Sequence, residues 1–281
     1  MLNTYGFVNT VVRKLKAGSS SGTCETFRVV MDWPNRSRPV PAFLKLTDPP
    51  MQQKLMVNEL LGNRIAKLRN LPVADTCPCA CREEFLRVKG ATKCIIGRDD
   101  SPFISGIASL DANPHQLKQY IFHGPKFADE LLKWRHCAEV AVYDELMCNG
   151  DRTSHNLLRT GPHEFLLIDH DQVLGGTGWT RESLAITLRK PASSNHLADL
   201  IINESQDEVT CRRIMKISQE YAENFVIPRN LSKQLAAECR IPADTTDFII
   251  DLLNQRMKLL PEIMSVYIRK NQLALRQQGD D

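Results

Sequence analysis

Two carboxylates and an amide, set at fixed spacings late in the chain, have the chemistry that phosphoryl transfer requires. Asp151 and Asn156 lie five residues apart in the run GDRTSHN, and Asp169 follows the apolar run 164–168. Phosphoryl transfer depends mainly on positioning and on neutralising charge. One carboxylate can orient or deprotonate the acceptor hydroxyl, while an amide oxygen and a second carboxylate can hold magnesium, which prefers hard oxygen ligands. The spacing indicates that Asp151 and Asn156 face one cleft, with Asp169 held at the end of a rigid strand.

Each of these pieces is common by itself, and a plainer interpretation stays open. Asp151 and Asn156 are also residue types that favour turns and caps, and Asp169 and Asp171 could be solvated residues after a core strand. The Asp–Asn spacing becomes more specific when an apolar strand ending in Asp follows closely.

The front half of the chain contains groups that could complete such a site. The Gly/Ser run 18–22 lies between two expected strands, where it is either a simple hairpin turn or a loop whose amides approach phosphate oxygens. Lys45 lies in the apolar strand 42–46, and an ammonium there must reach solvent or an anion, because burying it unpaired is costly. Glu59, early in the next expected helix, could pair with Lys45, or it could be an exposed carboxylate favoured by the helix dipole.

The elements expected to position these residues divide the chain into a strand-rich front and a helix-rich back, an α+β composition. Apolar and β-branched patterns predict strands over 7–16, 26–32, 42–46, 103–110 and 164–168. Helical spacing predicts helices over 54–69, 125–147, 208–225, 231–239 and 245–272. Asn230 is the expected cap of the helix over 231–239, and Pro261 is expected to break or kink the last helix.

The composition is that of a soluble globular protein. The 281 residues are 42% hydrophobic and 25% charged, enough for one large domain or two modest ones. The formal net charge of +3 argues against a dominant nucleic-acid footprint. No apolar run is long enough to cross a bilayer, and the amino terminus lacks the apolar core of a secretory signal, so we expect a cytoplasmic protein.

The cysteines fit the same compartment. There are nine, an odd number, and without a secretory signal reduced thiols are expected. Cys77, Cys79 and Cys81 are closely spaced, but no clear second pair of ligands follows, so we expect thiols of a loop or strand and no metal there.

The order of these features resembles the HipA-like branch of the protein-kinase-like fold. The features are the Gly/Ser run, the strand lysine, the helix that contains Asn58 and Glu59, and the motifs GDRTSHN and LLIDHD. The last two are also similar to the catalytic loop and metal motif of phosphatidylinositol kinases. The segment 58–73, NELLGNRIAKLRNLPV, looks like the helix and Leu-Pro-Val exit of HipA-like proteins. The resemblance covers roughly residues 8 to 190 and is most specific at 149–171.

The resemblance implies a two-lobed fold and a role for each matched residue. Residues 1–108 would form a small sheet-rich nucleotide-binding lobe, and residues 109–281 a helical catalytic lobe. Asp151 would be the catalytic base, Asn156 and Asp169 the magnesium ligands, and residues 103–110 the hinge beside adenine. The nucleotide-binding set would be Gly18, Ser19, Ser20, Ser21, Gly22, Lys45, Glu59, Ser154 and Asn156.

The sequence also departs from ordinary protein kinases. The metal motif is Asp-His-Asp without the usual glycine, and no long activation segment with A-P-E follows, so regulation by activation-loop phosphorylation is not expected. In some relatives a serine of the phosphate loop is phosphorylated, which makes Ser19, Ser20 and Ser21 candidates. His170 is expected to shape its loop, and Trp179 to pack in the core or line a substrate groove.

The predicted function is an ATP- and magnesium-dependent phosphotransferase that acts on Ser or Thr of a protein, with itself as a further acceptor. A lipid or small-molecule kinase is one alternative, because the motifs do not specify the acceptor. A non-catalytic nucleotide-binding module, with the helical tail from residue 205 as its partner surface, is the other. Neither a membrane nor a directly bound nucleic acid is an expected partner.

Overall fold

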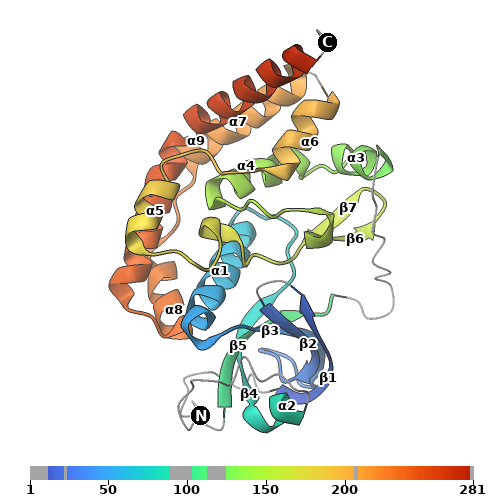
Figure 1. Ribbon diagram of the computed structural model, residues 1–281, viewed down its shortest axis with the longest axis vertical. Helices are drawn as coiled ribbons and strands as arrows, with labels where there is room; N and C mark the ends of the chain where they lie inside the picture. Colours follow the sequence, from blue (N-terminus) through green and yellow to red (C-terminus); the bar gives the residue numbers. More distant parts are fainter. Residues whose placement is uncertain (1–11, 22–23, 89–102, 113–124, 206–207, 279–281) are drawn as a thin grey trace.

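The computed structural model describes residues 12–21, 24–88, 103–112, 125–205 and 208–278. The fold is α+β, with a five-stranded antiparallel sheet followed by a mainly helical part (Figure 1). None of the described helices is both long and apolar enough to cross a lipid bilayer.

The sheet has the strand order β1-β2-β3-β5-β4. Its strands are β1 (Val12–Ser21), β2 (Cys24–Met31), β3 (Val40–Leu46), β4 (Thr76–Arg82) and β5 (Phe103–Leu110). The strands predicted over 26–32, 42–46 and 103–110 are confirmed. Along β2, Phe27, Val29 and Met31 are buried at alternate positions, which gives the strand one core face. The lobe boundary expected at residue 108 stays a prediction, and β5 continues to Leu110.

The sequence left the Gly/Ser run open between a hairpin turn and a phosphate-binding loop; its described residues are strand, and β1 does pair antiparallel with β2. Gly18, Ser19, Ser20 and Ser21 belong to β1, with Gly18 opposite Phe27 and Ser21 opposite Cys24 of β2. Pairing with β2 satisfies the backbone groups that face this strand and overrides the preference of these residues for turns. Gly22 lies outside the described residues, as do residues 7–11 of the expected first strand.

Helix α1 (Pro49–Leu68) begins five residues before the predicted start at 54. The amides of Met51 and Gln52 donate to the carbonyl of Asp48, and proline suits the first helical positions because its missing N–H is not needed there. Glu59 therefore lies in the middle of the helix and not near its start.

Helices dominate the rest of the chain. They are α2 (Glu83–Val88), α3 (Pro125–Leu132), α4 (Cys137–Met147), α5 (Arg181–Thr187), α6 (His196–Ser205), α7 (Glu208–Asn224), α8 (Arg229–Cys239) and α9 (Ala243–Gln278). The single helix predicted over 125–147 is in fact two, α3 and α4. Pro228 caps α8 and Asn230 lies inside it, while α9 runs through Pro261 without the predicted break.

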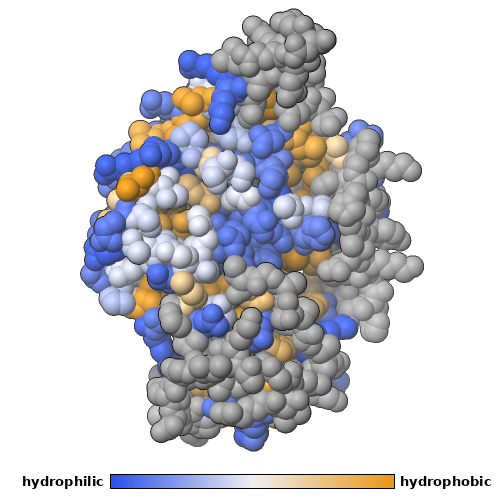
Figure 2. All heavy atoms as spheres, in the orientation of Figure 1, coloured by the Kyte–Doolittle hydropathy of each residue, from blue (hydrophilic) through white to orange (hydrophobic). Residues whose placement is uncertain are grey.

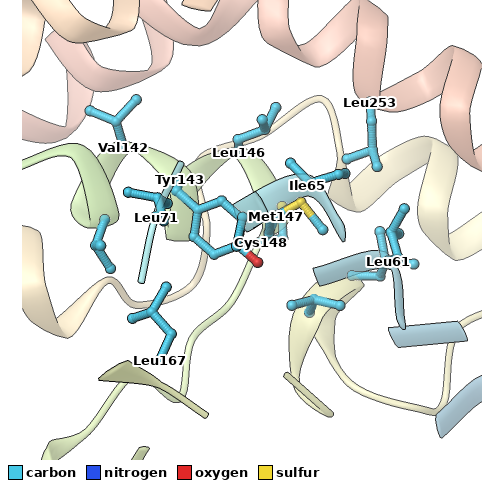
Figure 3. Close-up of a cluster of buried hydrophobic side chains, with 14 of the residues drawn as sticks. Leu61, Ile65, Leu71, Val142, Tyr143, Leu146, Met147, Cys148, Leu167 and Leu253 are labelled. Atoms are coloured by element: carbon cyan, nitrogen blue, oxygen red, sulfur yellow. The ribbon is translucent and has the colours of Figure 1, made fainter. Parts of the chain in front are cut away.

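The core of the helical part forms around α4, in which ten of eleven residues are buried. Figure 3 shows side chains of α1, α4, α9 and the strand β7 converging there, among them Leu61, Leu253 and Leu167. The Tyr143 hydroxyl donates to the carbonyl of Gly62, 2.8 Å away. Because α1 packs on α4, the helix that follows the lysine strand is fixed to the helix that precedes the Asp–Asn motif.

A hairpin of β6 (Leu157–Gly161) and β7 (Glu164–Leu167) is fixed to the exit of α1. The amide of Leu167 donates to Pro72 (2.8 Å), and the amide of Ala74 donates to Leu167 (3.1 Å). These bonds bring the end of β7, and therefore Asp169, beside the helix that contains Glu59.

The clustered cysteines lie on β4. Cys77, Cys79 and Cys81 are buried in the core of the sheet. Burial raises the pKa of Cys77 and of Cys81 to about 12, which keeps both thiols protonated at neutral pH.

Substitution of Gly62 tests the contact between α1 and the Asp-His-Asp segment. A Cβ at this position would lie 2.7 Å from Cβ of His170. We expect Gly62→Ala to destabilise the protein, because overpacking costs about 1–3 kcal/mol and exceeds the roughly 0.5–1 kcal/mol that alanine gains in a helix. Urea denaturation measures the change. Gly178→Ala is the control, since a Cβ there meets nothing within 4 Å; equal stability of the two variants would contradict the contact.

Candidate functional site

A cavity of about 520 Å³ lies where the sheet meets the helical part. Three of the predicted site residues, Lys45, Asp151 and Asp169, line it. The other described lining residues are Cys24, Thr26, Cys148, Gly150, Asp171, Gln172, Gly175, Ser193 and Ser194. Hydrophilic residues gather across the middle of the face drawn in Figure 2, between the sheet and the helices. The cavity therefore brings together residues from β2, β3 and the loops around the β6–β7 hairpin.

Lys45 is the charged centre of the cavity. Its Nζ lies 2.5 Å from Glu59 Oε1 and 2.5 Å from Asp169 Oδ1. Burial by itself would lower the pKa of Lys45, but the carboxylates of Glu59, Asp169 and Asp171 raise it above the ordinary value. Lys45 is therefore an ammonium at neutral pH, and the predicted pairing with Glu59 is present.

Glu59 joins the lysine to the segment that follows β7. It is almost fully buried, and while Oε1 faces Lys45, Oε2 accepts a hydrogen bond from the amide of His170 at 3.1 Å. The buried ring of His170 has a lowered pKa because of its burial and of the nearby Arg152 and Lys45, so the imidazole is neutral. The expectation that His170 shapes its loop agrees with this packing.

Asp169 is held in an unusual backbone conformation. Its φ of 59° lies in the left-handed region, which aspartate tolerates better than most residues. Burial by itself would raise the pKa of Asp169, but the ammonium of Lys45 outweighs this effect and brings the pKa below its ordinary value. The carboxylate therefore stays charged. Asp171 also lines the cavity, and burial together with the charge of Asp169 raises its pKa to about 7, although Lys45 partly opposes this. The sequence offered Asp171 only as a solvated residue.

Asp151 and Asn156 form one closed turn. The Asn156 side-chain amide donates to Asp151 Oδ2 at 2.9 Å and to the Asp151 carbonyl at 2.5 Å. Asp151 itself is exposed to the cavity, whereas Asn156 is buried. The spacing of five residues thus lets the amide nitrogen of Asn156 orient the carboxylate of Asp151, while the Asn156 oxygen is not used in these two bonds.

Arg152, within the same motif, was not predicted as a site residue. Its guanidinium is fully buried and pairs with Asp144 of α4 at 3.2 Å. It also donates to the carbonyls of Ile168 (2.6 Å) and Asn156 (3.3 Å). Arg152 therefore fixes the Asp151–Asn156 turn against the chain that leads into Asp169. A charged residue between two candidate site residues was the only sequence signal for this role.

The opposite wall of the cavity comes from the loop before α6. Ser194 Oγ donates to the carbonyl of Gly150 at 3.0 Å. A Cβ at Gly150 would lie only 2.7 Å from Ser194 Oγ, so the two segments are close together. Fully buried Arg256 of α9 holds the loop, since it pairs with Glu145 of α4 (2.8 Å) and donates to the Lys190 carbonyl (2.6 Å). No feature of the sequence indicated this wall.

Four groups of predicted residues are not among the described residues that line the cavity. Asn156 is buried and donates to Asp151. Glu59 lies behind Lys45 and is not a lining residue. Ser154, in the short 3-10 turn Ser154–Asn156, is half-buried and is not among the described residues that line the cavity. The strand residues Gly18–Ser21 end opposite Cys24, whose side chain does line it.

The described residues of the site offer few side chains that could hold a metal ion. No group of three or more His, Cys, Asp or Glu side chains suited to a metal occurs in the part of the chain that the structure describes. Asp169 offers a carboxylate that lines the cavity and pairs with Lys45, whereas Asn156 offers an amide that is buried beside Asp151 and is not among the described lining residues. Magnesium in nucleotide sites commonly takes only one or two protein ligands and completes its shell with phosphate oxygens and water.

Comparisons of the chain with models of protein families and with curated proteins find no match. The function is therefore inferred from the geometry of the cavity.

The buried Arg152–Asp144 pair can be tested by stability. We expect Arg152→Met to cost about 3–5 kcal/mol, because it leaves the buried Asp144 charge without its partner. Arg229→Met is the control: it removes an exposed pair with Asp251 and should change stability by less than about 1 kcal/mol. Guanidinium denaturation measures both, and similar losses in the two variants would argue against a structural role for Arg152.

Proposed function

We propose that this chain is an ATP- and magnesium-dependent phosphotransferase of the HipA-like type. The observation that carries the proposal is the placement of Lys45 between Glu59 and Asp169 in a cavity also lined by Asp151. An ammonium held between two carboxylates on rigid elements is suited to nucleotide phosphates. The proposal includes a two-lobed protein-kinase-like fold, with residues 1–108 as the nucleotide-binding lobe and 109–281 as the catalytic lobe.

The proposed reaction assigns a role to each polar group. The proton of the acceptor hydroxyl passes to Asp151, whose carboxylate is oriented by Asn156. The acceptor oxygen forms a bond to the γ-phosphorus while the bond to the β–γ bridging oxygen breaks, and ADP leaves. Lys45 neutralises phosphate charge. Asn156 and Asp169 are the residues that would hold magnesium, which would supply further neutralisation of the phosphates.

The proposed acceptor is a Ser or Thr hydroxyl of a protein, with Ser19, Ser20 and Ser21 of the chain itself as further candidates. The motifs and the order of elements support this choice only through the resemblance to HipA-like proteins. A lipid or small-molecule acceptor would use the same four groups, so acceptors of each kind belong in the assay.

Asp151→Asn should separate catalysis from binding. The substitution keeps the size of the side chain but removes the base, so transfer from γ-labelled ATP should fall about 10²–10⁴-fold while affinity for Mg-ATP is unchanged. The rate of transfer is measured with labelled ATP and three acceptors: dephosphorylated casein, phosphatidylinositol vesicles and the chain itself. Calorimetry measures the affinity for Mg-ATP. Asp251→Asn, on the surface of α9, is the control. Full activity of Asp151→Asn would contradict the assignment, and Mg-ATP binding by a wild-type chain that transfers to no acceptor would favour a non-catalytic nucleotide-binding module.

Asp169→Asn should remove the contribution of magnesium to nucleotide binding. The wild-type chain should bind ATP more tightly with Mg²⁺ than with EDTA, by about tenfold or more if one charged ligand contributes at least 1.4 kcal/mol. In the variant the difference between the two conditions should be much smaller, because the charged one of the two proposed ligands is gone and only the amide of Asn156 remains. Calorimetric titration measures all four affinities. An undiminished magnesium effect in the variant would exclude Asp169 as a ligand.

A further inference from the structure

We infer that Asn58 is a positioning residue that keeps Lys45, Glu59 and Asp169 assembled without any activating modification. The inference concerns the regulation of the site and rests on the proposed phosphotransfer function. In ordinary protein kinases, activation-loop phosphorylation brings the lysine–glutamate pair and the metal-binding aspartate into place. Here the same arrangement is held by hydrogen bonds within the fold.

Asn58 uses both ends of its side-chain amide. It is completely buried on α1. Its Nδ2 lies within hydrogen-bonding distance of three carbonyl oxygens, those of Asp171 (2.7 Å), Val173 (2.9 Å) and Gly176 (3.1 Å). Its Oδ1 accepts a hydrogen bond from the indole of Trp179 at 3.0 Å. One side chain therefore joins α1 to the segment 171–179, which begins two residues after Asp169.

Two other residues of α1, Lys54 and Glu59, hold the chain at Trp179 and at His170, which directly precedes the segment 171–179. Glu59 accepts from the amide of His170 (3.1 Å), and Lys54 donates to the carbonyl of Trp179 (2.5 Å) and lies over its ring, 5.1 Å from the centroid. Trp179 therefore packs against α1. The sequence analysis gave packing in the core as one of two roles for this residue. The helix that provides Glu59 and the segment that provides Asp169 are fixed to each other.

Moving α1 away from this segment would leave several buried polar groups unpaired. The carbonyls of Asp171 and Gly176 would lose the donor that Asn58 provides, and the Trp179 indole its acceptor, while the carbonyl of Val173 would keep only the amide of Gly176. Unpaired buried polar groups are costly, so the arrangement in which Lys45 contacts both carboxylates is strongly favoured over any open one. The segment is also short and well packed, with Val173 and Leu174 buried.

Two matched substitutions on α1 test the role of Asn58. Asn58→Asp keeps the shape and the acceptor for Trp179 but removes the donor to the three carbonyls. Asn63→Asp is the control, because Asn63 is also buried on α1 and donates to a backbone carbonyl, that of Ala74, away from the cavity. Both variants should lose stability. Only Asn58→Asp should lose kcat, by about 10²-fold, which is what a displacement of about 1 Å at a catalytic site can cost.

A second pair keeps the test available if Asn58→Asp does not fold. Trp179→Phe removes the hydrogen bond to Asn58 Oδ1 and retains an aromatic ring. Trp134→Phe is the control, because Trp134 is a buried tryptophan in the turn between α3 and α4 and its ring contacts Phe165. kcat should fall in the first and not in the second. In addition, wild-type chain treated with phosphatase until mass spectrometry finds no phosphate should keep its kcat.

The outcomes separate this inference from the proposed function. If the wild-type chain transfers phosphate but Asn58→Asp and Asn63→Asp, or the two tryptophan variants, have equal kcat, the role of Asn58 is wrong and the function stands. Loss of activity on phosphatase treatment would likewise overturn it. If the wild-type chain transfers phosphate to no acceptor, the phosphotransfer function fails, and the inference that depends on it fails as well.

Discussion

A buried ammonium needs negative partners, and much of this molecule is arranged to provide them to Lys45. The lysine lies on β3, the middle strand of the sheet, which pairs with β2 and β5. Its two partners come from α1 and from the end of the β6–β7 hairpin. For both to meet Lys45, the helix must pack against the sheet on one side and against the hairpin on the other. The bonds of Leu167 to Pro72 and Ala74 and those of Asn58 provide the second contact.

Two buried arginines give the site its second level of support, and both depend on α4. Asp144 and Glu145 are consecutive residues of this helix, and each pairs with a fully buried guanidinium. Arg152 connects the helix to the Asp151–Asn156 turn. Arg256 connects it to the loop before α6, which contains Ser193 and Ser194. Buried ion pairs contribute little net stability compared with apolar side chains of similar size. Their value here is geometric, since planar guanidinium groups bind several carbonyls in fixed directions.

The sequence was most informative where one residue's environment demanded a partner. A lysine in an apolar strand had to reach either solvent or an anion, and Glu59, the anion considered, is its partner. The predicted strands over 26–32, 42–46 and 103–110 were also correct, because their apolar patterns repeat locally. The Gly/Ser run was misjudged because pairing with β2 decided its conformation. Asn58 and Arg152 were missed as site residues because their partners lie across loops or more than a hundred residues away, and such contacts leave no periodic pattern in the sequence.

α9 packs against α4, and α8 packs against α1, which has a consequence for how the chain reaches its native state. Leu61 of α1 and Leu253 of α9 belong to one core, which residues of the first third of the chain cannot bury by themselves (Figure 3). Contacts between residues so distant in sequence delay folding, because a long loop must close before they are formed. During synthesis, the helix that carries Glu59 therefore has no complete apolar cover until α8 has left the ribosome, about 170 residues later.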